Sequence, residues 1–219
     1  MQRMRLAGRI IFLMCAALLA GGCGAVVGSG HVVLDSRPVR GFSGVELAGP
    51  GNVVIEQTGA DSLTVEAEDN LQLLLEAQVV DGWLHLGVAP NAAIRPTRPI
   101  TFHVTIRTLH GLYNGSAGSM SVPHVATDTL QVVVAGSGAI AVAGTAQAQA
   151  VRVAGSGSYA AKQLETASAR IEMTGSGHAE VTVNEQLDVT VSGSGSVEYF
   201  GHPVVKENVT GSGSIVSKS

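Results

Sequence analysis

The chain has 219 residues, of which 45% are hydrophobic and 14% are charged. This composition is too apolar for a disordered chain, and a net charge of −4 argues against nucleic acid as a partner. Aromatic residues make up only 4% and glycines number 28, so the core has to be built from small aliphatic side chains. Such a composition favours thin, layered β structure over a helical globule.

The N-terminus has the pattern of an export signal. Three arginines (Arg3, Arg5 and Arg9) precede an apolar run over residues 10–20. The run is too short to cross a bilayer as a helix, which takes about 20 residues. We therefore expect residues 1–22 to be a signal peptide. Its removal would leave 10 basic residues against 17 acidic ones.

The segment Leu19–Cys23 resembles a bacterial lipobox. The resemblance implies cleavage before Cys23 and attachment of acyl chains such as palmitate to that residue. Because Cys15 lies inside the signal, lipidation would also remove the single free thiol of the mature chain. Gly24, rather than Asp, follows the cysteine, and resemblance to lipoprotein sorting in Gram-negative bacteria then implies the outer membrane. An ordinary secretory signal cleaved nearby is the alternative.

A Gly-Ser-Gly triplet recurs at nearly even intervals through the second half of the chain, and a degenerate copy, residues 115–118, precedes the first by one similar interval. Apolar and polar residues alternate on both sides of the triplets, which predicts half-buried strands joined by glycine bends. We assign the bends to ten glycines: Gly136, Gly138, Gly155, Gly157, Gly175, Gly177, Gly193, Gly195, Gly211 and Gly213.

A unit of about 18–21 residues cannot bury its apolar face alone, but stacked units can. The repeat therefore predicts a β-solenoid with the apolar side chains inside and the triplet serines outside, one above another. Those serines are Ser137, Ser156, Ser176, Ser194 and Ser212. Two alternatives are a flexible Gly-Ser linker array and an antiparallel meander or sandwich.

The front half of the chain is less regular. Residues 23–40 are expected to form a lipidated tether, in which residues 32–34 favour a strand. Further strands are expected over residues 42–47, 53–57, 63–67 and 100–106, and residues 48–52 resemble the later bends. A hairpin is expected over residues 79–88, because Asp81-Gly82 favours a two-residue turn. The Leu-rich segment Asp69–Ala77 predicts one short helix.

These front-half motifs, followed by the triplets, resemble a known family. They are Gly41–Leu47 (GFSGVEL), Gly51–Gln57 (GNVVIEQ) and Asp81–Leu84 (DGWL). Together they are similar to the “putative auto-transporter adhesin, head GIN domain” family over about residues 40–216. The resemblance implies a right-handed, pectin-lyase-like parallel β-helix for residues 41–219. It also implies a role in adhesion or cell-envelope interaction and supplies no catalytic residues.

The polar residues do not predict a catalytic site. The seven histidines show no metal-ligand arrangement, so neither a metal nor a cofactor is expected. Glu180 and Glu198 lie one coil apart and could sit next to each other, as could Asp188 and Glu207. We interpret these acids as a solvated face. Alternation places Tyr159 and Tyr199 in the core.

The leading hypothesis is a non-enzymatic cell-envelope lipoprotein that is attached to the membrane through its lipid and binds a glycan or an envelope protein. A degenerate or unrecognised polysaccharide-active enzyme on a β-helix is the alternative. A third possibility is a scaffold that assembles through its end coils. In that case Glu207, at an apolar position of the last repeat, would act as a cap against growth.

Overall fold

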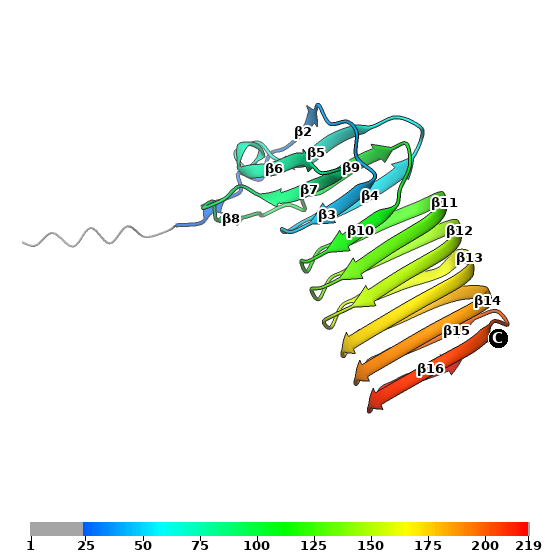
Figure 1. The fold of residues 1–219 in the computed structure, drawn as a ribbon. Coiled ribbons are helices and arrows are strands. Elements are labelled where there is room, and N and C mark those ends of the chain that lie inside the picture. Colours follow the sequence, from blue (N-terminus) through cyan, green and yellow to red (C-terminus); the bar gives the residue numbers. More distant parts are fainter. Residues whose placement is uncertain (1–23, 219) are drawn as a thin grey trace, which may run out of the picture.

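The computed structural model describes residues 24–218, which form an all-β molecule built around one long parallel stack (Figure 1). The chain winds into a β-solenoid of about five turns. Four long strands make up its middle: β11 (Ser119–Val134), β12 (Ala139–Val153), β13 (Ser158–Gly175) and β14 (His178–Gly193). The predicted solenoid is therefore confirmed, and the linker array and the antiparallel meander are wrong for this half of the chain.

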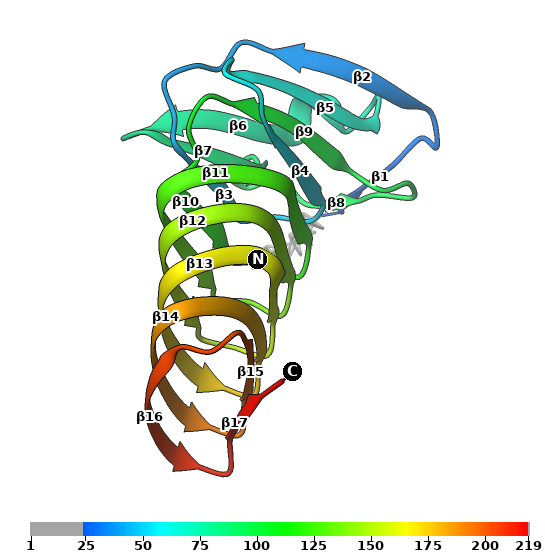
Figure 2. The same ribbon diagram turned by 90° about the vertical axis from the view of Figure 1, so that its right-hand side faces the viewer.

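Each long strand bends in its middle, so that one coil has an outgoing half after a triplet and an incoming half before the next (Figure 2). Neighbouring coils pair in parallel register along both halves, as Ile140 with Tyr159 and Val132 with Val151 show. The register shifts at the bends, for example between Ala141 and Ala143. The apolar side chains of the two halves meet inside the coil.

The core is a set of columns in which each coil adds one residue. Val132, Val151, Ile171 and Val189 form one such column, and each is no more than 3% exposed. Burial of each such side chain contributes about 1.5–3 kcal/mol, which is how a protein with few aromatic residues stabilises its fold. Tyr159 is fully buried, as its alternation predicts, whereas Tyr199 is half-buried and packs against the edge of the core.

A short series of hydrogen-bonded polar side chains, the polar chain of the core, lies within this apolar interior. The Tyr159 hydroxyl donates to Gln149 Oε1 at 2.9 Å, and Gln149 Nε2 donates to Thr166 Oγ1 at 3.1 Å. Thr166 in turn donates to the carbonyl of Thr182. Burial raises the pKa of Tyr159, so its hydroxyl stays protonated and remains a donor.

The triplets lie at the corners between coils. In the first four copies the first glycine is half-buried, the serine is exposed and the second glycine is buried. The corners also pair with each other: Ser194 N–H donates to the carbonyl of Gly175 at 2.9 Å, and Ser212 N–H to that of Gly193 at 2.9 Å. A Cβ on Gly175 would lie 2.6 Å from the carbonyl oxygen of Gly155, so these corners stack backbone on backbone.

The same corner continues into the front half. Leu47 and Asn52 are in register with Asn114 and Ser119, which places Gly49–Gly51 above residues 116–118. The predicted similarity of residues 48–52 to the later bends is therefore confirmed. Asn114 is in register with Val134, so Ser116 of the degenerate copy, rather than Gly115, lies beside Gly136.

The remaining strands of the stack are short. Before the long strands come β3 (Gly44–Leu47), β4 (Asn52–Gln57), β7 (Trp83–Val88), β9 (Thr101–Ile106) and β10 (Gly111–Asn114). After them come β15 (Ser196–Phe200), β16 (Val204–Gly211) and β17 (Ser214–Ser217). Strands β3, β4, β7 and β9 agree with the expected ones to within a few residues at each end.

The front half departs from the parallel stack on one side. Strand β2 (Val32–Arg37) pairs antiparallel with β5 (Ser62–Glu68), and β5 pairs antiparallel with β9. A two-residue pair, β1 (Val26–Val27) with β8 (Ile94–Arg95), lies beside them. The strand expected at residues 32–34 is thus confirmed, and through β2 the segment predicted as a tether is part of the sheet.

The predicted helix over Asp69–Ala77 is wrong. Only a single 3-10 turn, Gln72–Leu74, forms there, and Leu75 begins strand β6 (Leu75–Val80). This strand pairs along its whole length with β7 through the turn at Asp81-Gly82, as the hairpin prediction requires. Two helical turns alone are marginal in water, so the hairpin pairing prevails over the local leucine spacing.

The predicted signal peptide and Cys23 lie outside the described residues. Within residues 24–218, no helix has the length and apolar character needed to cross a membrane.

Candidate functional site

Outward-facing residues form columns along the solenoid, because the residues of each coil lie beside the corresponding residues of the coil before it. One column begins at Trp83 and runs through Gly44, Gly111, Gln131 and Ala150. It continues through Arg170 and Asp188 to Lys206. The outer face of the incoming halves therefore presents one continuous column of residues from the front half to the last coils, and the Trp83 ring covers its two glycines.

A groove of about 660 Å³ is hollowed along this face. Small side chains, Ala148, Ala150 and Ser168, lie in its middle, where two neighbouring coils meet. Longer polar side chains, Gln131, Arg170, Asp188 and Lys206, also line it, and Arg170 is the register partner of Ala150. The small residues let a chain approach the sheet closely, and the polar ones offer both hydrogen-bond donors and acceptors.

Trp83 lies at the front end of the same column. Its indole ring packs across two coils, because a Cβ on Gly44 or Gly111 would lie 2.5 Å from the ring. Glycine is required at both places for the ring to lie against the backbone. A smaller hollow beside Trp83 shares Thr129 and Gln131 with the groove, so the groove extends to this aromatic residue.

The charges in the groove are partly paired. Arg170 Nη2 lies 3.3 Å from Asp188 Oδ2, and Lys206 is the register partner of Asp188 in the next coil. Asp188 is the one acid among the described residues that line this 660 Å³ groove. An acid/base pair for glycoside hydrolysis needs two carboxylates, and this lining offers one.

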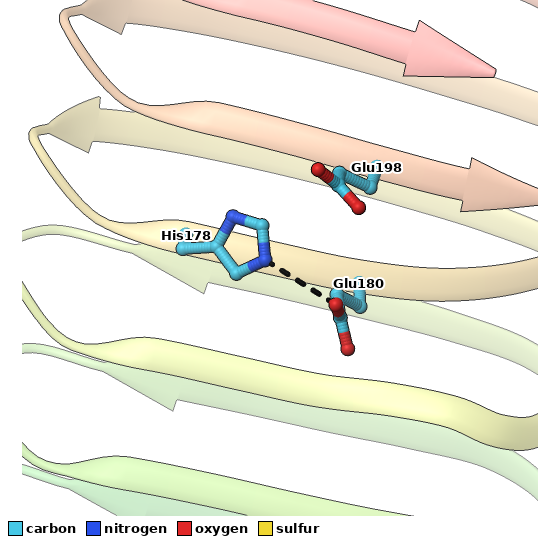
Figure 3. A group of neighbouring side chains, drawn as sticks. All are labelled: His178, Glu180 and Glu198. Atoms are coloured by element: carbon cyan, nitrogen blue, oxygen red, sulfur yellow. Dashed lines mark ion pairs between the residues drawn. The ribbon is translucent and has the colours of Figure 1, made fainter. Parts of the chain in front are cut away.

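A second cluster lies on the outer face of the outgoing halves. His178 and Glu180 are two residues apart on β14, and Glu198 on β15 is the register partner of Glu180 (Figure 3). The expectation that Glu180 and Glu198 sit next to each other is therefore confirmed. One ligand atom from each of the three side chains lies within 4.8 Å of the others.

The cluster is held by neighbouring groups. His178 Nε2 lies 3.6 Å from Glu180 Oε1, and His178 Nδ1 is 2.9 Å from Ser196 Oγ. Lys218 Nζ lies 3.2 Å from Glu198 Oε1. The position of His178 beside the two glutamates was not predicted from the sequence. The signal that could have predicted it is the His-x-Glu pattern, which places both side chains on one face of a strand, together with a glutamate one repeat later.

Asp188 and Glu207 do not meet. In the register of β14 with β16, Asp188 lies beside Lys206, and Glu207 lies beside the core residue Val189. The two acids therefore point to opposite faces of the strand pair, and the expectation that they approach is wrong. Glu207 is exposed because no described coil covers it at this end of the stack.

Two further histidines on strands pair with glutamates. His85 Nδ1 lies 2.9 Å from Glu46 Oε2, and His103 Nε2 lies 2.9 Å from Glu66 Oε2. Each pair offers one histidine and one carboxylate. Among the described residues, three possible metal ligands come together at His178, Glu180 and Glu198.

Comparison with known proteins gives a consistent result. A model of the family described as “Putative auto-transporter adhesin, head GIN domain” matches residues 41–203. The chain is similar to a “putative adhesin” from Bacteroides fragilis, with 23% identity, a TM-score of 0.75 and coverage of 89% of this chain and 100% of that one. No curated protein matches the chain.

Two structures from Parabacteroides distasonis are also similar. One is a “putative lipid binding protein” with 22% identity, a TM-score of 0.58 and coverage of 90% of this chain and 100% of that one. The other is a “putative adhesin” with 19% identity, a TM-score of 0.57 and coverage of 89% and 100%. At these identities the likenesses show the fold.

Proposed function

This chain belongs to the “Putative auto-transporter adhesin, head GIN domain” family, and from that premise we propose that it is a non-enzymatic binding protein of the bacterial cell envelope. The observation that carries the proposal is the groove along the incoming halves, about 660 Å³ in volume and continuous with Trp83. A rigid solenoid that repeats one surface from coil to coil is suited to an extended partner.

The chemistry of the groove favours a polysaccharide strand as that partner. Sugars offer hydroxyls that pair with planar polar groups such as those of Gln131, Arg170 and Asp188. Their apolar ring faces pack on aromatic side chains, and Trp83 lies in line with these residues. The small side chains of Ala148 and Ala150 leave room for the strand to lie along the sheet.

Attachment to the membrane through a lipid on Cys23 completes the proposal. Its support is the lipobox-like segment Leu19–Cys23 and the preceding apolar run. Metabolic labelling with a palmitate analogue tests it. We expect label on the wild-type protein and none on a Cys23→Ser variant, whereas an unlabelled wild-type protein would point to an ordinary secretory signal.

A glycan array tests the binding function. The chain from Gly24 onward contains every described strand and serves as the probe. We expect retention on a defined set of polysaccharides and its loss in Ala150→Phe, which fills the groove. Ala141→Phe is the matched control, because Ala141 is an exposed alanine on the outgoing half of the same strand.

The same panel separates binding from catalysis. The alternative, a polysaccharide-active enzyme, draws support from Asp188, Arg170 and Lys206 sharing one groove. Release of shorter products from a retained polysaccharide, abolished by Asp188→Asn, would establish that alternative. Absence of retention on every glycan would remove the support for a polysaccharide ligand.

A further inference from the structure

We infer that His178, Glu180 and Glu198 form a zinc-binding site that joins the last coils of the solenoid. The site lies on the outgoing halves, and none of its residues lines the groove on the incoming halves. The inference is therefore independent of the proposed binding function, and either can fail without the other.

The geometry is close to that of a three-ligand zinc site. Zinc bonds of about 2.0–2.2 Å at tetrahedral angles separate ligand atoms by roughly 3.4 Å. His178 Nε2 and Glu180 Oε1 are already 3.6 Å apart, and the full set lies within 4.8 Å. Figure 3 shows the three side chains on the same side of two neighbouring strands, where small rotations of the glutamates would close the set.

A neighbouring hydroxyl orients the histidine. Ser196 Oγ is 2.9 Å from His178 Nδ1, and Ser196 is the register partner of His178 in the next coil. When Nδ1–H donates to this oxygen, the lone pair of Nε2 is free for a metal and lies on the side of Glu180. Metal-binding histidines commonly have such a partner on the second ring nitrogen.

Electrostatic repulsion between the two glutamates also favours a bound cation. Glu180 and Glu198 are direct partners in a parallel strand pair, and like charges in this position are destabilising. Lys218 Nζ lies 3.2 Å from Glu198 and offsets part of this repulsion, but its side chain is 43% exposed, so solvent weakens the ion pair. A divalent ion between the carboxylates would neutralise both and would compete with Lys218 for Glu198.

The donor set selects the metal. One imidazole nitrogen and two carboxylates suit zinc, whereas calcium and magnesium prefer sets of oxygen atoms alone. Three protein ligands leave a fourth position for water or for an oxygen atom of a bound partner. The bound ion would link β14 to β15 near the end of the stack, where the core is least covered.

Isothermal titration calorimetry with zinc chloride tests the site. The chain from Gly24 onward, without a histidine tag, is suitable because it lacks both Cys15 and Cys23 and their metal-binding thiols. We expect one zinc ion per chain and no heat from calcium. Glu198→Gln and His178→Gln should abolish the binding, and Ser196→Ala should weaken it by about 10-fold or more.

Two further variants make the result specific. His103→Ala removes a histidine that pairs with a single glutamate and should leave zinc binding unchanged. Lys218→Ala removes the competing ammonium group and should tighten binding by roughly two- to fivefold, the factor that a surface ion pair is worth. Because all these residues are at least partly exposed, a melting temperature without zinc that is not below that of the wild type will show that each variant is folded.

Four outcomes would overturn the inference. The first three are no zinc binding by the wild-type chain, wild-type zinc binding by Glu198→Gln, and a loss of zinc binding in His103→Ala equal to that in His178→Gln. Equal heats with calcium would also do so, because they would assign the site to oxygen ligands alone. Zinc should in addition raise the melting temperature of the wild-type chain and leave that of Glu198→Gln unchanged.

Discussion

Glu68 accepts a hydrogen bond from the backbone N–H of Gly30, with 2.6 Å between the carboxylate oxygen and the nitrogen. The same carboxylate accepts from the N–H of Thr97 at 2.8 Å, and Glu68 is only 1% exposed. One buried acid thus ties the segment before β2 to the loop before β9. This contact adds to the pairing of β1 with β8 and of β2 with β5, which together hold the first described residues against the front half.

The first prediction concerns pH. Burial disfavours the charged form of Glu68, but hydrogen bonds from Thr97, Gly30 and Arg98 outweigh it and lower its pKa from 4.5 to about 2. Because the folded pKa is below the unfolded one, the contribution to stability is complete above about pH 4.5. We expect it to be lost as the pH falls from 4.5 towards 2.

Thermal unfolding of the wild-type protein and of Glu68→Gln measures this effect. The variant should melt at a lower temperature at pH 6, and the difference should shrink towards pH 2. Glu56→Gln is a suitable control, because Glu56 is exposed on β4. A difference between wild type and Glu68→Gln that does not change with pH would contradict the assignment.

The second prediction concerns the corners. Gly175 has φ +120°, and a Cβ there would lie 2.6 Å from the carbonyl oxygen of Gly155. Gly175→Val should therefore lower the free energy of unfolding by about 2–5 kcal/mol, through backbone strain and the clash together. Ser176→Ala, an exposed neighbour, should change it by less than about 0.5 kcal/mol. Urea unfolding gives both values, and equal stabilities would show that the corner is not crowded.

The third prediction concerns the polar chain in the core. Tyr159→Phe removes the donor to Gln149 Oε1 and leaves that buried oxygen unpaired, at a cost of about 1–3 kcal/mol. In the Gln149→Met background the same change should cost much less, because no acceptor is left unpaired. A double-mutant cycle by urea unfolding measures the coupling, and strictly additive effects would argue against the hydrogen bond.

The fourth prediction concerns the end of the stack. Glu207 is exposed, and it occupies the column that Val189 fills in the preceding coil. Glu207→Val would place an apolar residue at an uncovered end next to Val209, which is 42% exposed. We expect this variant to associate end to end at concentrations where the wild type does not.

Sedimentation velocity detects this association. Asn208→Val is the matched control, because Asn208 is exposed on the same strand but pairs with the outward-facing position of Thr190. If both variants associate equally, general surface hydrophobicity explains the result. If neither does, Glu207 is not a cap.

The coils and their corners could be predicted from the amino-acid sequence alone. Alternating apolar residues around the triplets specify which side chains face inward, and the interval between triplets specifies which residues become neighbours in the next coil. For that reason the meeting of Glu180 with Glu198 and the burial of Tyr159 could be predicted. These features depend on the alternation of apolar and polar residues along each strand and on the number of residues in one coil, and both can be read from the amino-acid sequence.

Other features depend on how distant segments pack together. The strand at Leu75–Val80 forms because it pairs with β7, which outweighs the local leucine pattern that predicted a helix. The hollow beside Trp83 exists because the indole ring packs on Gly44 and Gly111 of two other strands, and this packing extends the groove to an aromatic residue. Contacts of this kind depend on the three-dimensional register of non-repeating residues, and local sequence patterns carry no record of that register.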